Sequence, residues 1–318
     1  MDALTQALAA SPELFPHSLD VEKGTVTLIR LSEQAYRQAS FLDTRVLTPT
    51  TQSRALPWRE LAAAAEPLPE AADFIFHIGH VGSTLLARLL GAHPKVFALR
   101  EPMILRTLAQ TDRYDHAPVL KLLSRTFRPE QRALVKATSF VSEIAPKITA
   151  RGPRAIFMFV PAEIYLATIL GGPNSRQEAR VLGVARYSRL AARKPIAQPA
   201  SEGELIAMSW ACEMTALQAV PDTDRILWLD FDRFLAEPEA SLAQCFRHIG
   251  IDATETEIGA ILAGPDMRTY SKAQEYDYDA KLRGAVLAQA RAQHGTEIAR
   301  GLAWLERNGF GEGRLAEP

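Results

Sequence analysis

The chain has 318 residues, of which 47% are hydrophobic and 23% charged, and its formal net charge is −1 at pH 7. This length fits one large α/β domain or two small ones, and the composition is that of an ordinary globular protein. The near-zero charge excludes a general attraction to nucleic acid or anionic membranes, although it leaves room for a local basic pocket. No window approaches the roughly eighteen consecutive apolar residues that a membrane span requires, so we expect none.

The cysteines and the N-terminus give no sign of a metal site or of export. Cys212 and Cys245 lie in segments of helical apolar periodicity and are expected to be buried, reduced thiols. The histidines are scattered and no CxxC motif is present, so we predict no metal. Residues 1–14 lack the basic stretch and apolar core of a signal peptide, and the expected location is therefore the cytoplasm.

Residues 1–70 differ in character from the rest of the chain. The elements predicted there are a strand at Val26–Leu31, a short helix capped by Ser32 and running through Arg37, a loop at Thr48–Ser53, and an Ala-rich helix at Trp58–Ala65. We expect this region to form an N-terminal extension packed on a main domain that spans residues 71–318.

From Asp73 onward, apolar strand-like runs alternate with helical segments. The runs are mostly continuous, as expected for parallel strands buried on both faces. Such alternation indicates βαβ units, and ligands then bind at the carboxyl ends of the strands. The predicted strands are Phe74–Ile78, Val96–Leu99, Leu134–Ala137, Ala155–Val160 and Arg225–Leu229; the predicted helices are Thr84–Ala92, Ile104–Ala109, Ala162–Leu170, Gly203–Val220 and Glu239–Ile249. The predicted fold class is α/β, a three-layer sandwich with a central, mainly parallel sheet flanked by helices.

The remaining segments are connections and a C-terminal helix. We predict a mobile loop at Gly171–Ser175, a basic helical stretch at Arg180–Lys194, a linker at Pro195–Ser201, a polar and aromatic segment at Met267–Tyr278, and an Ala-rich helix ending near Asn308–Gly309.

A glycine turn follows the first strand of the main domain. It spans Gly79–Thr84, with the sequence Gly-His-Val-Gly-Ser-Thr, and leads into a helix. Backbone N–H groups at a helix N-terminus favour a phosphate or sulfate group. A Walker A loop carries a lysine immediately before its hydroxyl residue, whereas here Gly82 precedes Ser83. The turn therefore predicts an anion site without the lysine typical of ATP binding; the alternative is an ordinary strand–turn–helix connection.

A second polar position follows the next predicted strand. The helix after the glycine turn ends at His93-Pro94, and the strand that follows delivers Glu101 to the same edge of the sheet. A carboxylate there is placed to accept a proton from a hydroxyl group. The spacing alone instead favours a salt bridge with Arg100 or a solvated acid at the strand end.

These two segments together resemble the 5′-phosphosulfate loop and following segment of sulfotransferases. The similarity is greatest to the tyrosylprotein and bacterial branch, in which the loop is followed by His-Pro-x-Val and a glutamate. Ala207–Trp210 in a long helix, Arg225–Leu242 and Cys245–Gly250 resemble further segments of the family. The resemblance covers about residues 73–275. It implies a P-loop-type enzyme that transfers a sulfuryl group from 3′-phosphoadenosine 5′-phosphosulfate (PAPS) to a hydroxyl or amine, without a metal.

The resemblance also assigns roles by position. It implies that Glu101 is the catalytic base and that Lys136, after a strand, faces the bridging oxygen of the donor. His80 replaces the basic residue that opens the family loop, and Thr168 keeps a hydroxyl of the 3′-phosphate site. The residues implied to bind the 5′-phosphate and sulfate are Gly79, His80, Val81, Gly82, Ser83 and Thr84.

The second cofactor site departs from the family pattern. Val160 stands where the family arginine holds the 3′-phosphate, and a Glu163 that pointed inward would repel that phosphate. The basic residues that would compensate are Arg186, Arg189, Arg268 and Lys272. Two other functions stay open: a kinase-like phosphoryl transferase with an unusual loop, and a sulfotransferase-like binding module that has lost PAPS.

The acceptor is a small molecule or a peptide, and neither its identity nor the oligomeric state is predicted. We expect acceptor contacts from residues 1–70, from the Gly171–Arg176 loop and from Tyr270–Tyr278, because loops at strand ends usually set specificity.

Overall fold

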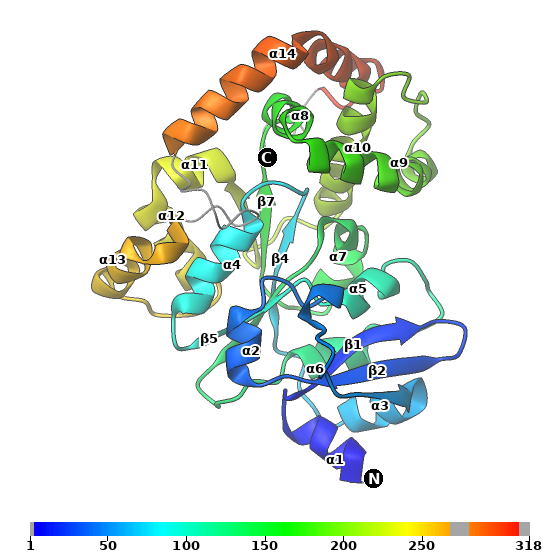
Figure 1. The fold of residues 1–318 in the computed structure, drawn as a ribbon, viewed down its shortest axis with the longest axis vertical. Helices are drawn as coiled ribbons and strands as arrows, with labels where there is room; N and C mark the ends of the chain where they lie inside the picture. The colour runs from blue at the N-terminus through cyan, green and yellow to red at the C-terminus, as the bar shows by residue number, and fades with distance from the viewer. Residues whose placement is uncertain (1–2, 268–279, 312–318) are drawn as a thin grey trace.

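The computed structural model describes residues 3–267 and 280–311, and it contains a five-stranded sheet in the order β5-β6-β4-β7-β8. All paired strands of this sheet are parallel. The strands are β4 (Asp73–His77), β5 (Val96–Arg100), β6 (Arg132–Lys136), β7 (Ala155–Phe159) and β8 (Ile226–Asp230). The α/β class and the five predicted strands are confirmed, with strand ends shifted by at most two residues. Figure 1 shows β4 and β7 near the centre of the molecule.

The strands of this sheet are mostly apolar runs, as expected for a parallel sheet that is covered on both faces. Every residue of β4, β5 and β7 is buried, so these strands need cover on both faces. Helix α4 (Ser83–Ala92) packs on β4, β5 and β6. The other helices of the main domain are α5 (Met103–Leu108), α6 (Ala117–Leu123), α7 (Ala145–Thr149), α8 (Ala162–Gly171), α9 (Pro173–Arg193), α10 (Glu202–Gln218), α11 (Phe231–Ala236), α12 (Pro238–His248), α13 (Glu255–Ala263) and α14 (Ala280–Arg307), with 3₁₀ turns η2 (Ser139–Ile144) and η3 (Pro265–Met267).

Four helices form a cluster at one end of the molecule. Helix α10 contacts α8, α9 and α14, and α8 also contacts α9 and α14; the four helices lie together at the top of Figure 1. The loop predicted at Gly171–Ser175 is wrong: α8 runs to Gly171, and α9 begins at Pro173. The Gly-Gly-Pro sequence marks a junction between two helices, because proline is well tolerated in the first turn of a helix. The predicted C-terminal helix is confirmed as α14, whereas residues 268–278 of the predicted polar segment lie outside the described residues.

The N-terminal region forms a separate antiparallel sheet in the order β1-β2-β3. Its elements are α1 (Ala3–Ala10), β1 (Leu14–Asp20), β2 (Thr25–Arg30), α2 (Glu33–Gln38), η1 (Thr44–Val46), β3 (Ser53–Pro57) and α3 (Trp58–Ala65). The predicted strand and both predicted helices are present, and the Ser32 hydroxyl accepts the Ala35 N–H at 3.2 Å. Strand β1 was not predicted, because Pro16 interrupts its pattern of alternating apolar residues. The register of its pairing with β2 shifts between Pro16 and Ser18, and β1 is an edge strand, where proline is tolerated.

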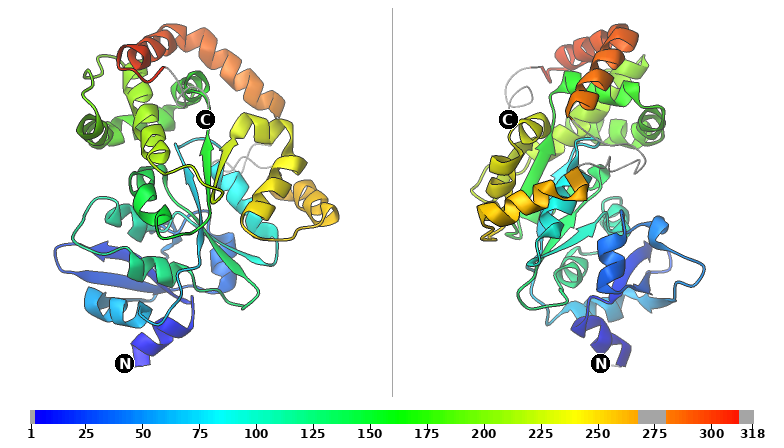
Figure 2. Two further views of the ribbon diagram at one scale, coloured as in Figure 1. Left: turned by 180° about the vertical axis from the view of Figure 1, so that it is seen from behind. Right: turned by 60° about the vertical axis from the view of Figure 1, so that its left-hand side comes forward.

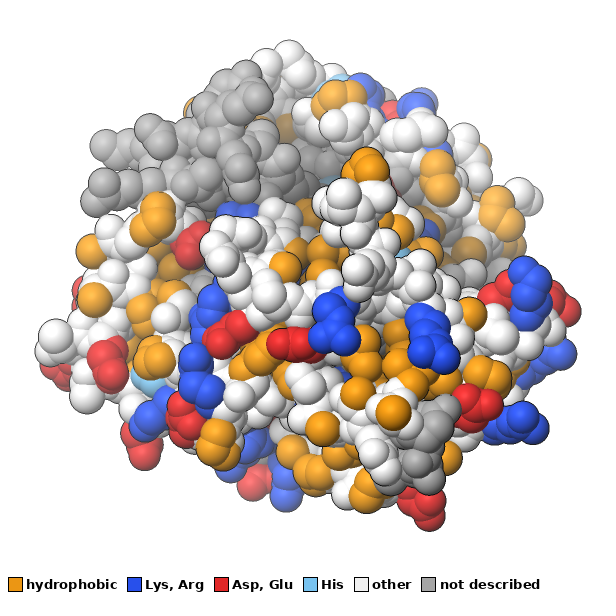
Figure 3. Space-filling model, turned by 60° about the horizontal axis from the view of Figure 1, so that its bottom comes forward, with side chains coloured by type: hydrophobic (Ala, Val, Ile, Leu, Met, Phe, Trp, Pro, Cys, Tyr) orange, Lys and Arg blue, Asp and Glu red, His pale blue; other side chains and the backbone are white. Residues whose placement is uncertain are grey.

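Aromatic packing joins the two sheets. Tyr36 of α2 lies edge-on to Phe15 of β1 and to Phe97 of β5, with ring centroids 5.7 and 5.0 Å apart. The buried apolar residues of both regions form one continuous core. Figure 2 shows the N-terminal sheet from two further directions. On the face seen in Figure 3, acidic and basic side chains are interspersed, in keeping with the small net charge.

Within residues 3–267 and 280–311, no helix is both long and apolar enough to cross a membrane. The same residues contain no cluster of histidine, cysteine and carboxylate side chains suited to a metal ion.

Candidate active site at the carboxyl edge of the sheet

The carboxyl ends of β4, β5 and β6 meet at a cavity of about 400 Å³. Lys136, the last residue of β6, pairs in register with Ile75 of β4 and with Arg100 of β5. The segments that follow these three strands therefore line the same cavity. The cavity is lined by Phe41, Asp43, Thr44, Arg45, His77, Gly79, His80, Val81, Gly82, Ser83, Thr84, Glu101, Met103, Arg106, Thr107, Gln110, Lys136, Thr138, Ser139, Phe140, Glu178 and Leu182.

The glycine turn owes its shape to left-handed backbone conformations. Gly79, His80 and Gly82 have φ values of 92°, 55° and 68°. At Gly82 the lack of a side chain is also a packing requirement, because a Cβ atom there would lie 2.0 Å from the ring of Phe231. Gly82 is the N-cap of α4, so the turn ends where the helix dipole begins.

The backbone N–H groups of the turn divide into two sets. The Gly79 N–H donates to Nδ1 of His77 at 3.0 Å, and Nε2 of that ring donates to the carbonyl of Ala137 at 2.9 Å. The N–H groups of residues 81–84 have no hydrogen-bond acceptor within the part of the chain that the structure describes. These four donors lie at the N-terminus of a ten-residue helix beside the cavity, where an anion is stabilised.

Glu101 and Lys136 form an ion pair in the cavity. Lys136 Nζ donates to Glu101 Oε1, and the Glu101 N–H donates to the carbonyl of Lys136 at 2.6 Å. The Lys136 side chain is 2% exposed and that of Glu101 16%. Glu101 also has a φ of 55°, an uncommon conformation for a residue other than glycine, and such strain often marks functional sites.

Arg100 is not the partner of Glu101. Its guanidinium donates to the carbonyls of Tyr36, Arg37 and Ala39 at the end of α2. Burial lowers the pKa of Arg100 to about 10, which leaves it charged at neutral pH. The salt bridge that the spacing favoured is therefore made by Lys136, from a neighbouring strand, instead.

One wall of the cavity comes from η1 and the segment before it, which carry no recognisable motif. The Asp43 carboxylate accepts a hydrogen bond from Arg45 Nε at 2.8 Å, and Arg45 lies 3.7 Å above the ring of Phe41. Burial alone would raise the pKa of Asp43, but the hydrogen bonds from Arg45 outweigh it and lower that pKa. Arg45 Nη2 lies 3.9 Å from Glu101 Oε2, so this wall reaches the ion pair.

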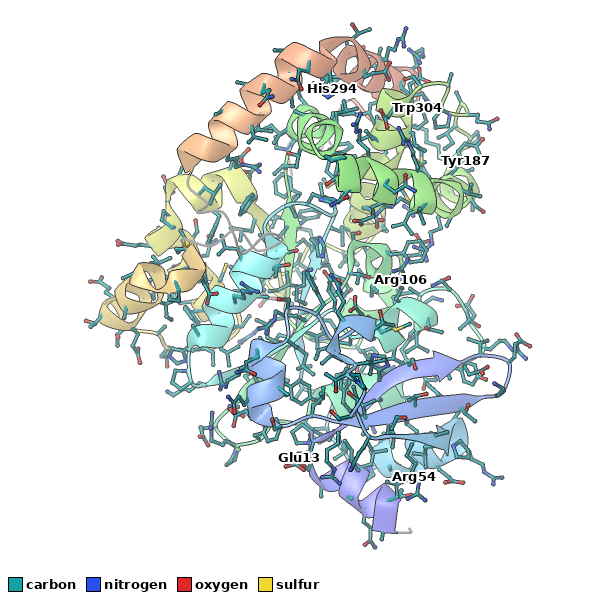
Figure 4. The ribbon with its side chains drawn as sticks, in the orientation of Figure 1. Glu13, Arg54, Arg106, Tyr187, His294 and Trp304 are labelled. Atoms are coloured by element: carbon teal, nitrogen blue, oxygen red, sulfur yellow. The ribbon has the colours of Figure 1, made fainter. Side chains whose placement is uncertain are left out.

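The opposite wall is formed by α5, η2 and α9. Arg106, labelled in Figure 4, is exposed at the cavity and lies 5.8 Å from the ring centroid of Phe140. His80 faces α9: its Nδ1 lies 3.2 Å from Ser175 Oγ, and its Nε2 lies 3.4 Å from a Glu178 carboxylate oxygen. Ser175 was expected in a loop, and its place in α9 is what brings it and Glu178 to His80.

The proposed 3′-phosphate residues lie apart from this cavity. Val160 is 1% exposed, and its carbonyl accepts the Trp210 indole N–H at 3.0 Å. The Thr168 hydroxyl donates to the carbonyl of Ile164 at 2.7 Å within α8, and Thr168 does not line the cavity. Glu163 does not stand unpaired beside the site, because Arg291 forms two hydrogen bonds with its carboxylate, at 2.7 and 2.8 Å.

The candidate compensating arginines are engaged elsewhere. Arg186 is buried and donates to Glu213 and Ser139, and Arg189 donates to the carbonyls of Phe140 and Ala109. The other two candidates, Arg268 and Lys272, lie outside the described residues.

No family model matches the chain, and no curated protein sequence matches it. Among solved structures the chain is similar to mouse sulfotransferase SULT7A1 complexed with PAP, with a TM-score of 0.44 and 11% identity over 79% of this chain and 91% of that one. It is also similar to a sulfotransferase from Alicyclobacillus acidocaldarius, with a TM-score of 0.39 and 13% identity over 74% and 94% of the two chains. For sulfotransferase STF9 from Mycobacterium avium these values are 0.41, 10%, 73% and 79%.

Proposed function

We propose that this chain is a sulfotransferase that moves a sulfuryl group from PAPS to a hydroxyl or amine acceptor by direct in-line transfer. The observation that carries the proposal is the meeting of two features in one cavity. Four backbone donors without acceptors, at residues 81–84, lie beside the Glu101–Lys136 pair. Sulfuryl transfer resembles phosphoryl transfer in needing positioned donors and charge stabilisation more than covalent help from the protein.

The groups of the turn fit an esterified phosphate or sulfate. The N–H groups of residues 81–84 and the hydroxyls of Ser83 and Thr84 are donors, and both hydroxyl side chains are at least nine-tenths buried. Backbone donors without a protein acceptor favour a ligand that brings acceptor oxygens. The absence of a lysine before Ser83 separates this turn from a Walker A loop.

Glu101 and Lys136 are suited to opposite roles. The Glu101 carboxylate accepts the proton that the acceptor hydroxyl or amine loses when it attacks sulfur. The Lys136 ammonium donates to the oxygen on which negative charge builds as the sulfur–oxygen bond breaks. His80, whose ring nitrogens lie against Ser175 and Glu178, adds positive charge at the start of the turn when it is protonated.

The acceptor binds beside Glu101, on the walls outside the turn. Phe41, Met103 and Phe140 supply apolar surface there, while Arg45 and Arg106 supply positive charge. This mixture suits an acceptor with a flat apolar body and a polar or anionic edge, either a small molecule or a peptide side chain.

Thermal unfolding of the full chain with three nucleotides tests the proposal. Adenosine 3′,5′-bisphosphate, the product left by PAPS, should raise the free energy of unfolding by about 2.7 kcal/mol at about 100 times its dissociation constant. Lys136→Met should lose much of this shift, whereas Lys95→Met, which removes the same charge at an exposed position, should keep it.

The other ligands separate the remaining functions. A shift with ATP and magnesium alone would favour a phosphoryl transferase. The absence of a shift with the bisphosphate, with ATP and magnesium and with adenosine 5′-phosphosulfate would contradict both enzyme functions and leave a binding module.

A further inference from the structure

A fully buried ion pair lies behind the cavity wall. Arg186 of α9 and Glu213 of α10 are joined by a hydrogen bond of 2.8 Å between Nε and Oε1, and their side chains are 3% and 1% exposed. Removing two charges from water is expensive, and an apolar pair of the same volume is often equally stable. Stability alone therefore does not explain why these two helices carry charges here.

The pair reaches the cavity through Ser139. Arg186 Nη2 donates to Ser139 Oγ at 3.1 Å. A guanidinium has donors but no acceptor, so the Ser139 oxygen must accept this bond and its own proton must be directed elsewhere. That hydroxyl has no acceptor among the residues that the structure describes.

Ser139 lies next to the glycine turn. It is 6% exposed, begins η2 after β6 and lines the cavity. Its Oγ lies 3.4 Å from the position that a Cβ atom on Gly79 would occupy. The hydroxyl therefore lies beside the glycine turn and in the lining of the same cavity.

We propose that Ser139 is a further donor to the phosphate or sulfate oxygens bound at the glycine turn, and that Arg186 and Glu213 are positioning residues that act through it. This inference rests on the proposed function. Glu213 fixes the guanidinium, and the guanidinium fixes and polarises the hydroxyl, because hydrogen bonds in a chain strengthen one another in a low dielectric. With its side chain 3% exposed, Arg186 contributes to the site through Ser139 and not by direct contact.

Isothermal titration of the full chain with adenosine 3′,5′-bisphosphate tests this assignment. Ser139→Ala should weaken binding about 10–100-fold, the usual effect of losing a hydrogen bond to a charged group. The double variant Arg186→Met/Glu213→Leu should keep a urea midpoint near that of the wild type, because it leaves no unpaired charge, and should still weaken binding.

The triple variant separates positioning from a structural role. If the pair acts only through Ser139, adding Arg186→Met/Glu213→Leu to Ser139→Ala should change the affinity no further. The matched control is Arg180→Met/Glu202→Leu, which removes an exposed ion pair between the same two helices and should leave the affinity unchanged. If the double variant does not fold, Arg186→Lys keeps the charge without the fork and should weaken binding toward the level of Ser139→Ala.

The outcomes distinguish this inference from the proposed function. No binding of the bisphosphate by the wild-type chain would overturn both. If the wild type binds the bisphosphate and Ser139→Ala leaves the affinity unchanged, the inference alone is overturned. The same holds if the losses of affinity from Ser139→Ala and from Arg186→Met/Glu213→Leu simply add in the triple variant.

Discussion

The two halves of the carboxyl edge of the parallel sheet are built differently. At the ends of β5 and β6, Glu101 and Lys136 place charged side chains in the cavity. Beyond β7, the polar groups form hydrogen bonds with other protein side chains. The Val160 carbonyl accepts from Trp210, and the Glu163 carboxylate accepts from Arg291. The charged groups that line the cavity therefore lie on one side of the turn, while the described residues on the other side mainly hold the fold together.

The glycine turn connects the two halves. It follows β4, the central strand, and Gly82 packs directly against Phe231 at the end of β8. The position of the N–H groups of residues 81–84 therefore depends on a residue that follows the strand at the far edge of the sheet. The substitutions that follow change a residue in one half or at this connection, and the effect is measured as a change in activity, affinity or stability.

The largest effect is expected from Glu101→Gln on the β5–β6 side. Removal of a positioned base lowers rates by about 10²–10⁴-fold, and the amide should leave nucleotide affinity close to that of the wild type. The measurement is transfer of labelled sulfate from PAPS to a panel of hydroxyl acceptors, alongside titration with the bisphosphate.

The control for this variant is Glu239→Gln, which makes the same change at an exposed residue of α12 outside the cavity. Transfer by the Glu101 variant at the rate of the control would show that another group accepts the proton.

An intermediate effect is expected from Gly82→Ala at the connection. A left-handed conformation costs a residue with a side chain about 1–2 kcal/mol, and the contact with Phe231 adds about 1–3 kcal/mol of overpacking. Urea unfolding measures the loss of stability. Gly24→Ala is the matched control, because Gly24 has a similar φ of 62° but its nearest neighbour lies 3.2 Å from the added Cβ. Equal losses in the two variants would mean that Phe231 does not hold the turn.

The smallest effect is expected from Glu163→Gln on the β7–β8 side. The hydrogen bond from Arg291 lowers the pKa of Glu163 below its usual value near 4.5, so the ion pair adds stability at neutral pH. That contribution should disappear as the pH falls through the lowered pKa. Both side chains are more than a third exposed, and solvent screening limits the contribution to at most about 1 kcal/mol.

Urea unfolding of the wild type and the Glu163 variant at pH 7 and at about pH 3 checks this sign. The two proteins should differ at pH 7 and converge at the lower pH; a difference that grows on acidification would contradict it.

The parallel sheet was predictable because its strands are mostly apolar runs, and so was the approach of the glycine turn to Glu101 and Lys136, since all three lie at the carboxyl ends of strands of that sheet. Strand β1 was not predictable from periodicity, because Pro16 and His17 break its pattern. The Gly171–Ser175 prediction failed because glycine and proline also mark helix junctions.

The side-chain connections within the site depend on tertiary structure alone. Ser139, Arg186 and Glu213 lie far apart in the sequence, and no motif links them. The Asp43–Arg45 pair likewise comes from a short 3₁₀ turn, η1, and the residue that caps it. Sequence spacing predicts that a residue lies at a strand end, but it does not predict which buried residue will form a hydrogen bond with its side chain and orient it.

The most direct test of the central claim is an amide NMR titration of the full chain with adenosine 3′,5′-bisphosphate. We expect the N–H resonances of residues 81–84 to shift most, because these donors have no acceptor within the described structure. The resonance of Gly79 should shift less, because its N–H is bonded to His77. Saturating binding that leaves the resonances of residues 81–84 unmoved would contradict the claim that this turn holds the anion.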